Sequence, residues 1–384
     1  MLNSMNMTGR RKSDALVATG IWWVVYLMIA LVLTGCAATP VRTERTAVFY
    51  PPLPNPPRIQ HLVAFSAASD VRETPSTFFD FILGKERDID AVNKPYGVAI
   101  FDGKIYVVDT RGPGYAVFDL VKQRFDFVPG SGGGRMQKPI NISIDQDGAK
   151  YITDTGREQV LAFDRDDRFV RAYGAEKEYK PADVAVADDR LYVCDLKAHQ
   201  IVVLDKASGK VLSRFGKVGS KDGELFYPTN IALSPDGHLY VTDTGNYRVQ
   251  KFTLDGRHVR SYGTVGSGLG QFARPKGVAL DRDGRMYVVD AAFENVQVLD
   301  NDGKLLLFFG GPGDSPENIN LPTAITVDYA NAALFQKYAD PKFRLEYVIL
   351  VASQFGVNKV NVFGFGKMED MDYSTEMQPQ AGTP

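Results

Sequence analysis

The stretch Pro228-Thr-Asn-Ile-Ala-Leu-Ser-Pro-Asp-Gly-His-Leu-Tyr-Val-Thr-Asp-Thr-Gly-Asn-Tyr-Arg-Val-Gln-Lys-Phe252 contains three short apolar segments separated by two turn sequences. Short apolar segments bounded by turn residues are typical of β-strands. The Asp-Gly pair at 236–237 favours a hairpin, because glycine tolerates the positive φ that tight hairpin turns require. A second Asp-Gly pair at 255–256 precedes another apolar segment. The stretch therefore predicts four antiparallel strands, at 230–233, 239–243, 248–252 and 258–262.

The same pattern recurs along the chain, and each copy begins at a proline. The prolines stand at positions 95, 139, 181, 228, 275 and 322, with spacings of 44, 42, 47, 47 and 47 residues. A period in the forties built from short strands is typical of a β-propeller. The sequence thus predicts an all-β, six-bladed β-propeller of four-stranded antiparallel blades over residues 58–366.

The last copy lacks an outer strand, because its third strand at 360–363 is not followed by another apolar segment of this kind. Residues 58–65, which precede the first copy, resemble the outer strands at 168–173 and 210–215. We expect this N-terminal strand to pair with the last blade. That pairing closes the ring and covers a sheet edge that would otherwise be open to aggregation.

The N-terminus carries a second strong pattern. Three basic residues at 10–12 precede a hydrophobic run at 15–33, which ends in Leu33-Thr34-Gly35-Cys36. This arrangement predicts a secretory signal peptide at 1–35, with a transmembrane anchor as the alternative. The ending resembles the lipobox of bacterial lipoproteins. That resemblance implies lipidation of Cys36 and, because Ala37 rather than aspartate follows, a lipid-anchored place in the cell envelope at the outer membrane.

The segments flanking the predicted propeller have a different composition. Residues 36–57 include a dense proline run at 51–57, which predicts a lipidated, stiff tether. Residues 367–384 are polar and acidic, and predict a disordered tail. The whole chain has 44 basic and 46 acidic residues, which gives no global basis for nucleic-acid binding. Cys194 lies in a predicted strand, where we expect a small buried packing residue.

The copies resemble the NHL-repeat family of propellers. The resemblance rests on Phe215-Gly-Lys-Val-Gly-Ser-Lys-Asp-Gly-Glu-Leu-Phe-Tyr-Pro228, on Tyr240-Val-Thr-Asp-Thr-Gly-Asn-Tyr-Arg-Val249 and on the repetition of the first run at 262–275. It implies the propeller fold. It leaves function open, since NHL-like propellers include protein-binding and RNA-binding modules, sensors and a few lyases. The last blade departs from the pattern, with Gln354 where the strand aspartate is expected.

An aspartate ends the second strand of five blades. An acid repeated this regularly could form a catalytic ring, or each carboxylate could cap its own turn through backbone N–H groups. We favour the structural turn, because a catalytic site breaks symmetry whereas this pattern obeys it. These aspartates are Asp109, Asp154, Asp195, Asp243 and Asp290.

Basic residues gather in the loops expected on one face of the ring. These loops enter the innermost strands or join the second and third strands, and both kinds of loop lie at the same end of a blade. A basic face would attract an anionic group or an acidic partner, although some of its cations could instead pair with the turn aspartates, as Arg248 could with Asp243. The candidate contact residues are Lys94, Lys138, Lys180, Arg274, Arg111, Arg157 and Arg248.

The sequence contains no metal-ligand spacing among its four histidines and no nucleophile elbow, so we predict no catalytic residues, no metal and no cofactor. It favours a membrane-anchored, non-catalytic propeller that binds a protein or an anionic envelope component. Two alternatives stay open: an enzyme resembling propeller lyases or lactonases, with Asn141, Asp183 and Asn230 at the funnel mouth, or a small-ligand sensor. An insertion at 329–346 predicts a short amphipathic helix that packs against the ring.

Overall fold

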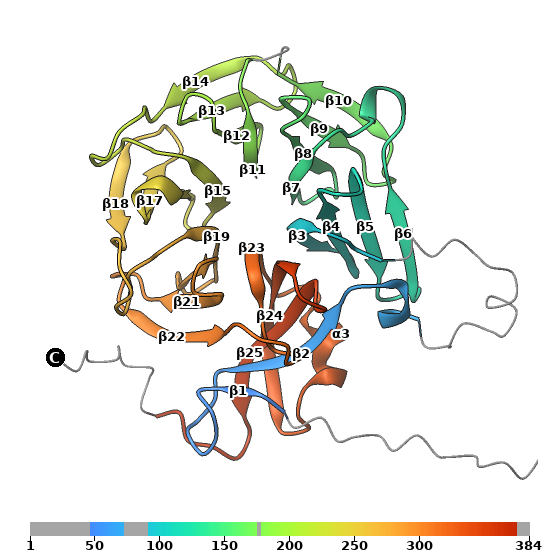
Figure 1. Ribbon diagram of the computed structural model, residues 1–384, viewed down its shortest axis with the longest axis vertical. Helices are drawn as coiled ribbons and strands as arrows, with labels where there is room; N and C mark the ends of the chain where they lie inside the picture. The colour runs from blue at the N-terminus through green and yellow to red at the C-terminus, as the bar shows by residue number, and fades with distance from the viewer. Residues whose placement is uncertain (1–46, 73–90, 175–177, 375–384) are drawn as a thin grey trace, which may run out of the picture. The chain divides into compact units, whose positions relative to one another are not determined.

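The computed structural model describes residues 47–72, 91–174 and 178–374 of the chain. Six antiparallel sheets stand around a common centre, and each sheet has one edge strand next to the central axis (Figure 1). The predicted six-bladed β-propeller is therefore confirmed. The innermost strands, in ring order, are β3 (Pro95–Phe101), β7 (Pro139–Ile144), β11 (Pro181–Ala187), β15 (Pro228–Leu233), β19 (Pro275–Leu280) and β23 (Asn320–Asp328).

Blades one to five each add three further strands in sequence order. They are β4 (Lys104–Asp109), β5 (Gly114–Asp119) and β6 (Arg124–Val128) in blade one; β8 (Lys150–Asp154), β9 (Gln159–Phe163) and β10 (Phe169–Tyr173) in blade two; β12 (Arg190–Asp195), β13 (Gln200–Asp205) and β14 (Val211–Phe215) in blade three; β16 (His238–Asp243), β17 (Arg248–Thr253) and β18 (His258–Tyr262) in blade four; and β20 (Met286–Asp290), β21 (Asn295–Leu299) and β22 (Leu305–Gly310) in blade five.

Alternation along the strands explains why neighbouring blades pack tightly. In β12, Leu191 and Val193 pack into the core shared with blade two, whereas Tyr192 and Cys194 pack into the core shared with blade four. All four side chains are buried. Successive side chains of a strand point to opposite faces of its sheet, so a blade that is apolar on both faces needs a neighbour on each side. Cys194 is the small packing residue that its position predicts.

The chain start completes the last blade, as predicted. Blade six contains β23, β24 (Phe343–Phe355) and β25 (Val360–Met368), and β2 (Ile59–Phe65) pairs antiparallel with β25. The register joins Ile59 to Phe365 and Phe65 to Val360. The buried ring of Phe65 packs 5.6 Å from that of Phe118 in blade one, measured between centroids. The N-terminal strand thus joins the last blade to the first.

The folded domain extends beyond both predicted boundaries. The predicted tether at 36–57 contains β1 (Phe49–Tyr50), which pairs with β2 and makes blade six five-stranded. Phe49 is buried, and its ring centroid lies 5.7 Å from that of Phe343. At the other end, the predicted disordered tail begins inside β25, because the long strand β24 gives Met368 a partner. Tyr373 Oη donates a 2.7 Å hydrogen bond to the carbonyl oxygen of Pro57.

The insertion in blade six forms the predicted helix, although a short one. Helix α3 (Ala332–Phe335) continues into the 3-10 turn η5 (Gln336–Tyr338) between β23 and β24. Phe335 is fully buried in the core shared by blades six and one. The N–H of Gly103 in blade one donates a 2.8 Å hydrogen bond to Asn331 Oδ1. The insertion therefore braces the junction at which the ring closes.

Within the described ranges, no helix combines the length and the apolar character that crossing a bilayer requires. The predicted signal peptide at 1–35 and its lipidation site, Cys36, lie outside these ranges. Residues 375–384 of the predicted tail lie outside them as well.

Closure of the ring by β2 predicts a large effect of Phe65→Ala on stability. Removing a buried phenylalanine side chain lowers the free energy of unfolding by about 3–5 kcal/mol. Val170→Ala on the outer strand β10, where the side chain is 58% exposed, is the matched control, with an expected change within about 0.5 kcal/mol. Urea unfolding followed by circular dichroism compares the two. Equal effects would contradict a closing role for β2.

Candidate functional site

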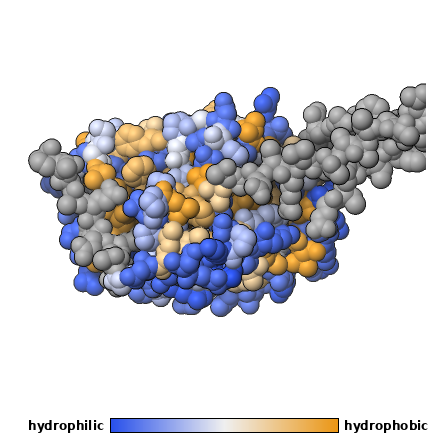
Figure 2. All heavy atoms as spheres, turned by 90° about the horizontal axis from the view of Figure 1, so that it is seen from below, coloured by the Kyte–Doolittle hydropathy of each residue, from blue (hydrophilic) through white to orange (hydrophobic). Residues whose placement is uncertain are grey.

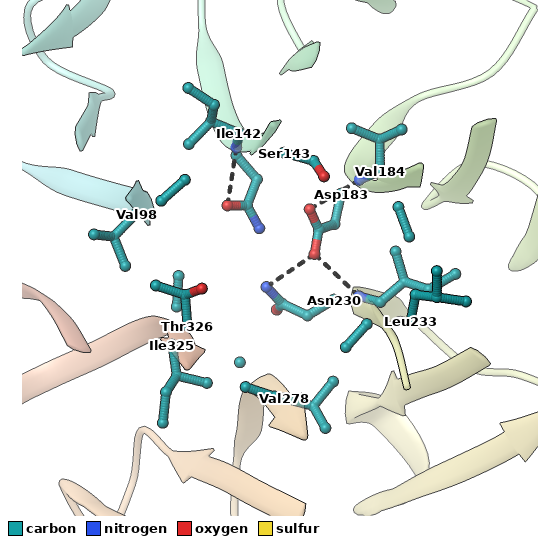
Figure 3. A pocket seen from close by; sticks show the side chains of 18 of the residues that line it. Val98, Ile142, Ser143, Asp183, Val184, Asn230, Leu233, Val278, Ile325 and Thr326 are labelled. Carbon is teal, nitrogen blue, oxygen red and sulfur yellow. Dashed lines mark hydrogen bonds between the residues drawn. The ribbon is translucent and has the colours of Figure 1, made fainter. Parts of the chain in front are cut away.

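The six innermost strands surround a cavity of about 290 Å³. Figure 3 shows side chains from all six strands pointing into this central channel. Most of the lining is aliphatic, including Val98, Ile142, Val184, Val278 and Ile325. Three amide or carboxyl side chains interrupt the aliphatic wall: Asn141 of β7, Asp183 of β11 and Asn230 of β15. Two hydroxyl side chains, Ser143 and Thr326, lie farther along their strands. The funnel residues of the enzyme hypothesis therefore do come together in one cavity.

The three polar residues break the symmetry of the ring. Each stands two positions after its proline, where the other three blades carry Gly97, Gly277 and Ala324. Small residues are needed there: a Cβ at Gly97 would collide with Asn141 Oδ1, and one at Gly277 would approach Ala324 Cα to 2.9 Å. The channel therefore has a polar half formed by blades two to four and a small-residue half formed by blades five, six and one.

Asp183 is the central charge of the polar half. Its carboxylate accepts hydrogen bonds from the backbone N–H of Val184 at 2.8 Å and of Ile231 at 3.0 Å, and a long one from Asn230 Nδ2 at 3.5 Å. Burial raises the pKa of Asp183 to about 7, although these hydrogen bonds act in the opposite direction. A carboxyl group with this pKa is poised to exchange a proton near neutral pH.

A second cavity of about 400 Å³ opens on the side of the ring where the six prolines lie. Residues one position after the prolines line it, among them Tyr96, Thr229 and Lys276. Burial, and then repulsion from Arg274, lower the pKa of Lys276 to about 8. Burial, and then the negative charge of Asp183, raise the pKa of Tyr96 to about 12. Titratable groups therefore face the channel from its proline side as well as from its polar half.

The five repeated aspartates hold the loops of the blades in place. Asp109 accepts hydrogen bonds from the backbone N–H groups of Asn93, Lys94, Arg111 and Gly112, at 2.6–3.2 Å. Asp154 and Asp290 each accept four such bonds in the same way. Each carboxylate thus ties the loop before its proline to the turn after its own strand. The five carboxylates are buried and their oxygens face backbone or side-chain donors, as a structural turn requires.

Blade six has no aspartate at the end of its second strand, and its loop is held in another way. Pro322 pairs with Ser353, so Ser353 occupies the aspartate position, and the assignment of that position to Gln354 was wrong by one residue. The loop before Pro322 is held instead by blade five, because Glu294 Oε1 accepts a 2.8 Å hydrogen bond from the N–H of Leu321. Only the strand register, which departs from the usual spacing in this blade, identifies the equivalent residue.

The predicted basic residues lie in loops on one side of the ring, which we call the proline face: the loops before the six prolines and the turns between second and third strands. Lys138, Lys180, Arg274 and Arg111 are exposed there. Lys94 is half-buried, and its Nζ lies 5.4 Å from the ring centroid of Phe355.

Two predicted contact residues are engaged within the fold instead. Arg248 is 9% exposed, and its Nε donates to Asp243 Oδ2 at 2.9 Å while Nη2 donates to two loop carbonyl oxygens. Arg157 donates to the carbonyl oxygens of Gly133 and Arg135 and to Gln159 Oε1. Pairing with a turn aspartate, the alternative for Arg248, is therefore what the structure shows. Both guanidinium groups hold loops of the fold in place, so they are not offered to a partner.

An aromatic cluster on the proline face was missed by the sequence reasoning. The rings of His199 and Phe226 are stacked with centroids 5.1 Å apart, and Tyr227 meets His199 edge-on at 4.7 Å. Phe226 is 38% exposed and Tyr227 is 49% exposed. The sequence did contain a signal for this cluster, because Tyr227 stands directly before its proline, at a position where four other blades carry Lys or Arg. Its φ of 53° is rare for an aromatic residue and is held by a 2.8 Å hydrogen bond from its N–H to His199 Nδ1.

Exposed apolar side chains concentrate in the same loops. Seen from the edge over blade six, hydrophobic residues form separate groups among hydrophilic ones (Figure 2). On the proline face they lie in the loops before Pro228 and Pro275 and in the turns of blades four and six. Large apolar residues that are at least 38% exposed in these loops are Val218, Phe226, Tyr227, Tyr247, Val265, Leu269, Phe355 and Val357.

Comparison with known proteins agrees with this architecture. The model of the NHL repeat matches residues 227–252, which confirms the predicted resemblance for that copy. Peptidyl-glycine alpha-amidating monooxygenase of Mus musculus is 28% identical over 176 residues, or 40% of this chain and 18% of that protein. Protein SUPPRESSOR OF QUENCHING 1, chloroplastic, of Arabidopsis thaliana is 24% identical over 208 residues, or 42% of this chain and 20% of that protein. The matches span about a fifth of the length of these relatives.

Solved structures share the fold at low sequence identity. A gluconolactonase from Xanthomonas campestris has a TM-score of 0.53 and 19% identity, covering 85% of this chain and 99% of that chain. A streptogramin B lyase has a TM-score of 0.50 and 16% identity, covering 71% and 94%. An auxiliary nutrient binding protein from Bacteroides thetaiotaomicron has a TM-score of 0.53 and 13% identity, covering 71% and 69%. Likeness at this level concerns the propeller fold alone.

The pKa of Asp183 predicts a pH dependence of stability. Because the pKa is raised on folding, the stabilisation by the protonated carboxyl is complete below about pH 4 and is lost as pH rises through 7. Between pH 4 and pH values above 7, the free energy of unfolding falls by at most about 4 kcal/mol. Asp183→Asn removes this dependence, so the variant gains free energy of unfolding relative to the natural protein between pH 5 and 8. Urea unfolding across this range measures the difference.

Asp147→Asn, which removes an exposed carboxylate from a hairpin turn, is the control for this comparison. Its difference from the natural protein stays flat over the same pH range. A flat difference for Asp183→Asn as well would show that Asp183 does not titrate in this range.

Proposed function

We propose that this protein is a membrane-anchored, non-catalytic binding module whose proline face captures a protein partner with an acidic and partly apolar surface. The observation that carries the proposal is that exposed apolar side chains concentrate in the loops of that face, where exposed cations also lie. Contiguous exposed apolar surface rimmed by polar residues is typical of interaction sites. A soluble anionic polymer would not need the aromatic part of this surface.

Three exposed cations of the proline face are without an ion-pair partner among the described residues. Among the described residues, no acidic side chain forms an ion pair with Lys138, Lys180 or Arg274, and the nearby turn carboxylates are occupied by backbone N–H groups. On the opposite face, which carries the Asp-Gly hairpins, Arg165 pairs with Asp102 and Arg260 pairs with Asp302. The proline face therefore keeps a positive field that can steer an acidic partner.

The aromatic cluster of His199, Phe226 and Tyr227 provides the apolar centre of the proposed contact. Tyrosine, phenylalanine and arginine are enriched in protein interfaces, and a few such residues carry most of the binding free energy. Tyr227 also lines the proline-side cavity together with Arg274. A partner side chain that entered this cavity would meet an aromatic ring and a guanidinium group within one small area.

The anchoring part of the proposal rests on the N-terminal sequence. A lipid on Cys36 would precede the first described residue, Ala47, by eleven positions. A fully extended segment of that length spans at most about 40 Å. Because β1 belongs to the folded domain, this reach is shorter than the proline-rich sequence alone suggests. A short link would hold the domain close to the bilayer, where its partner would also be found.

Charge reversal on the proline face is expected to abolish partner capture. The triple variant Lys138→Glu, Lys180→Glu and Arg274→Glu leaves the backbone hydrogen bonds of the three loops in place. We expect the amount of partner cross-linked in native membranes to fall at least ~10-fold, which corresponds to about 1.4 kcal/mol of binding free energy. Mass spectrometry of the cross-linked product measures it.

The matched control reverses three exposed cations in turns of the opposite face: Lys122→Glu, Lys210→Glu and Arg257→Glu. This variant has the same net charge as the first one and keeps its partner. Equal loss in both variants would point to net charge rather than to the proline face. Capture of a polysaccharide or another anionic polymer in place of a protein would contradict the proposed partner class.

The proposed lipid anchor has its own test. Mass spectrometry of the N-terminal peptide from the mature protein is expected to show Cys36 as the first residue, with the mass of attached acyl chains. An uncleaved leader, or an unmodified Cys36, would contradict the anchor and leave the propeller assignment untouched.

A further inference from the structure

The central channel contains two hydrogen-bond acceptors that the protein does not fully satisfy. Asp183, at 6% exposure, forms no ion pair with any described residue, and its donors are two backbone N–H groups and one distant amide. Asn230 Oδ1 is buried and has no hydrogen-bond partner among the described residues. An ionised carboxylate donates nothing, so the Asn230 amide turns its NH₂ toward Asp183 and leaves its oxygen without a donor. Because a buried acceptor without a donor costs free energy, a ligand that brings a hydrogen-bond donor is expected to bind here.

A third oxygen lies on the same half of the channel. Asn141 Oδ1 accepts one 3.0 Å hydrogen bond, from the N–H of Ile142, and an amide oxygen has a second lone pair. Asn141 lines the same cavity, and Figure 3 shows Asp183 and Asn230 pointing toward its middle from the two strands that follow β7. This cluster offers one negative charge and oxygen atoms from three side chains.

The rest of the cavity wall determines which kind of ligand body fits beside the polar cluster. It is made of aliphatic side chains such as Val98, Val184, Val278 and Ile325, with Leu233 farther along β15. The cavity, at about 290 Å³, lies at the small end of the ~300–1,000 Å³ range of ligand pockets. A fitting ligand is therefore small, with an aliphatic body and a cationic, donor-rich head.

We propose that the central cavity binds a small primary alkylammonium ion, with its –NH₃⁺ group held by Asp183, Asn230 and Asn141 and its alkyl chain against the aliphatic wall. An –NH₃⁺ group has three N–H donors and one positive charge, which match this acceptor set. A divalent metal fits less well, because it prefers several charged ligands, and the described residues contain no group of three His, Cys, Asp or Glu side chains. This site is independent of the partner surface on the proline face.

The pH dependence of binding follows from the groups around Asp183. Tyr96 and Cys194 are the titratable groups that interact with it, and both stay neutral near pH 7 because burial raises the pKa of each. Lys276 lines the adjacent proline-side cavity, and burial lowers its pKa to about 8. Ionisation of Asp183 therefore strengthens binding as pH rises from 5 to 7, and above 7 the loss of the positive charge of Lys276 adds a smaller gain. An alkylammonium ion keeps its proton until about pH 10.

The test uses n-butylammonium with the full chain, measured by isothermal titration calorimetry between pH 5 and 9. The neutral analogue n-butanol and the anion butyrate are the matched ligands. We expect saturable binding of n-butylammonium with 1:1 stoichiometry, an affinity that rises close to ~10-fold per pH unit below the pKa of Asp183, and no binding of the other two. Asp183→Asn is expected to lose the binding and its pH dependence.

The pH profile of the natural protein decides the outcome even where Asp183→Asn does not fold. Asn141→Ala, which removes one oxygen and leaves the charge, serves as the second variant, with an expected weakening of several-fold and an unchanged pH profile. The proposal is overturned if n-butylammonium does not bind at millimolar concentration, if butanol or butyrate binds equally well, or if the affinity is flat across pH 5–7.

Discussion

The whole ring depends on the pairing of β2 with β25. Each blade is apolar on both faces and needs a neighbour on either side, so an incomplete last blade would leave both its own edge and blade one uncovered. A strand from the chain start completes blade six, and β1 extends it further. The first and last parts of the chain therefore share one sheet, which closes the ring around the central channel.

The regular features of the repeat serve the fold, and the irregular ones carry the candidate functions. The buried turn aspartates repeat in five blades, and each is consumed by loop N–H groups. Where the sixth blade lacks the acid, Glu294 of its neighbour holds the loop. By contrast, Asp183, Phe226 and Tyr227 each occur once at their position in the repeat.

The molecule separates its charges in space. Arg274 and the lysines of the proline face stand in open loops, where solvent and salt reduce their field. Asp183 lies inside the ring, where burial keeps its pKa near 7 and makes its ionisation sensitive to whatever enters the channel. An acidic partner on the proline face and a small cation in the channel are therefore compatible, since each meets a charge of opposite sign.

The sequence by itself determined the blade count, the strand order, the closing strand and the turn role of the aspartates, because periodicity and turn chemistry act over short stretches of chain. It also placed Asn141, Asp183 and Asn230 at equivalent positions. Only the tertiary structure decided which cations can reach a partner, because Arg248 bonds to Asp243 and Arg157 bonds to a neighbouring loop. It alone also decided the raised pKa of Asp183, because burial arises from six strands that are distant in sequence.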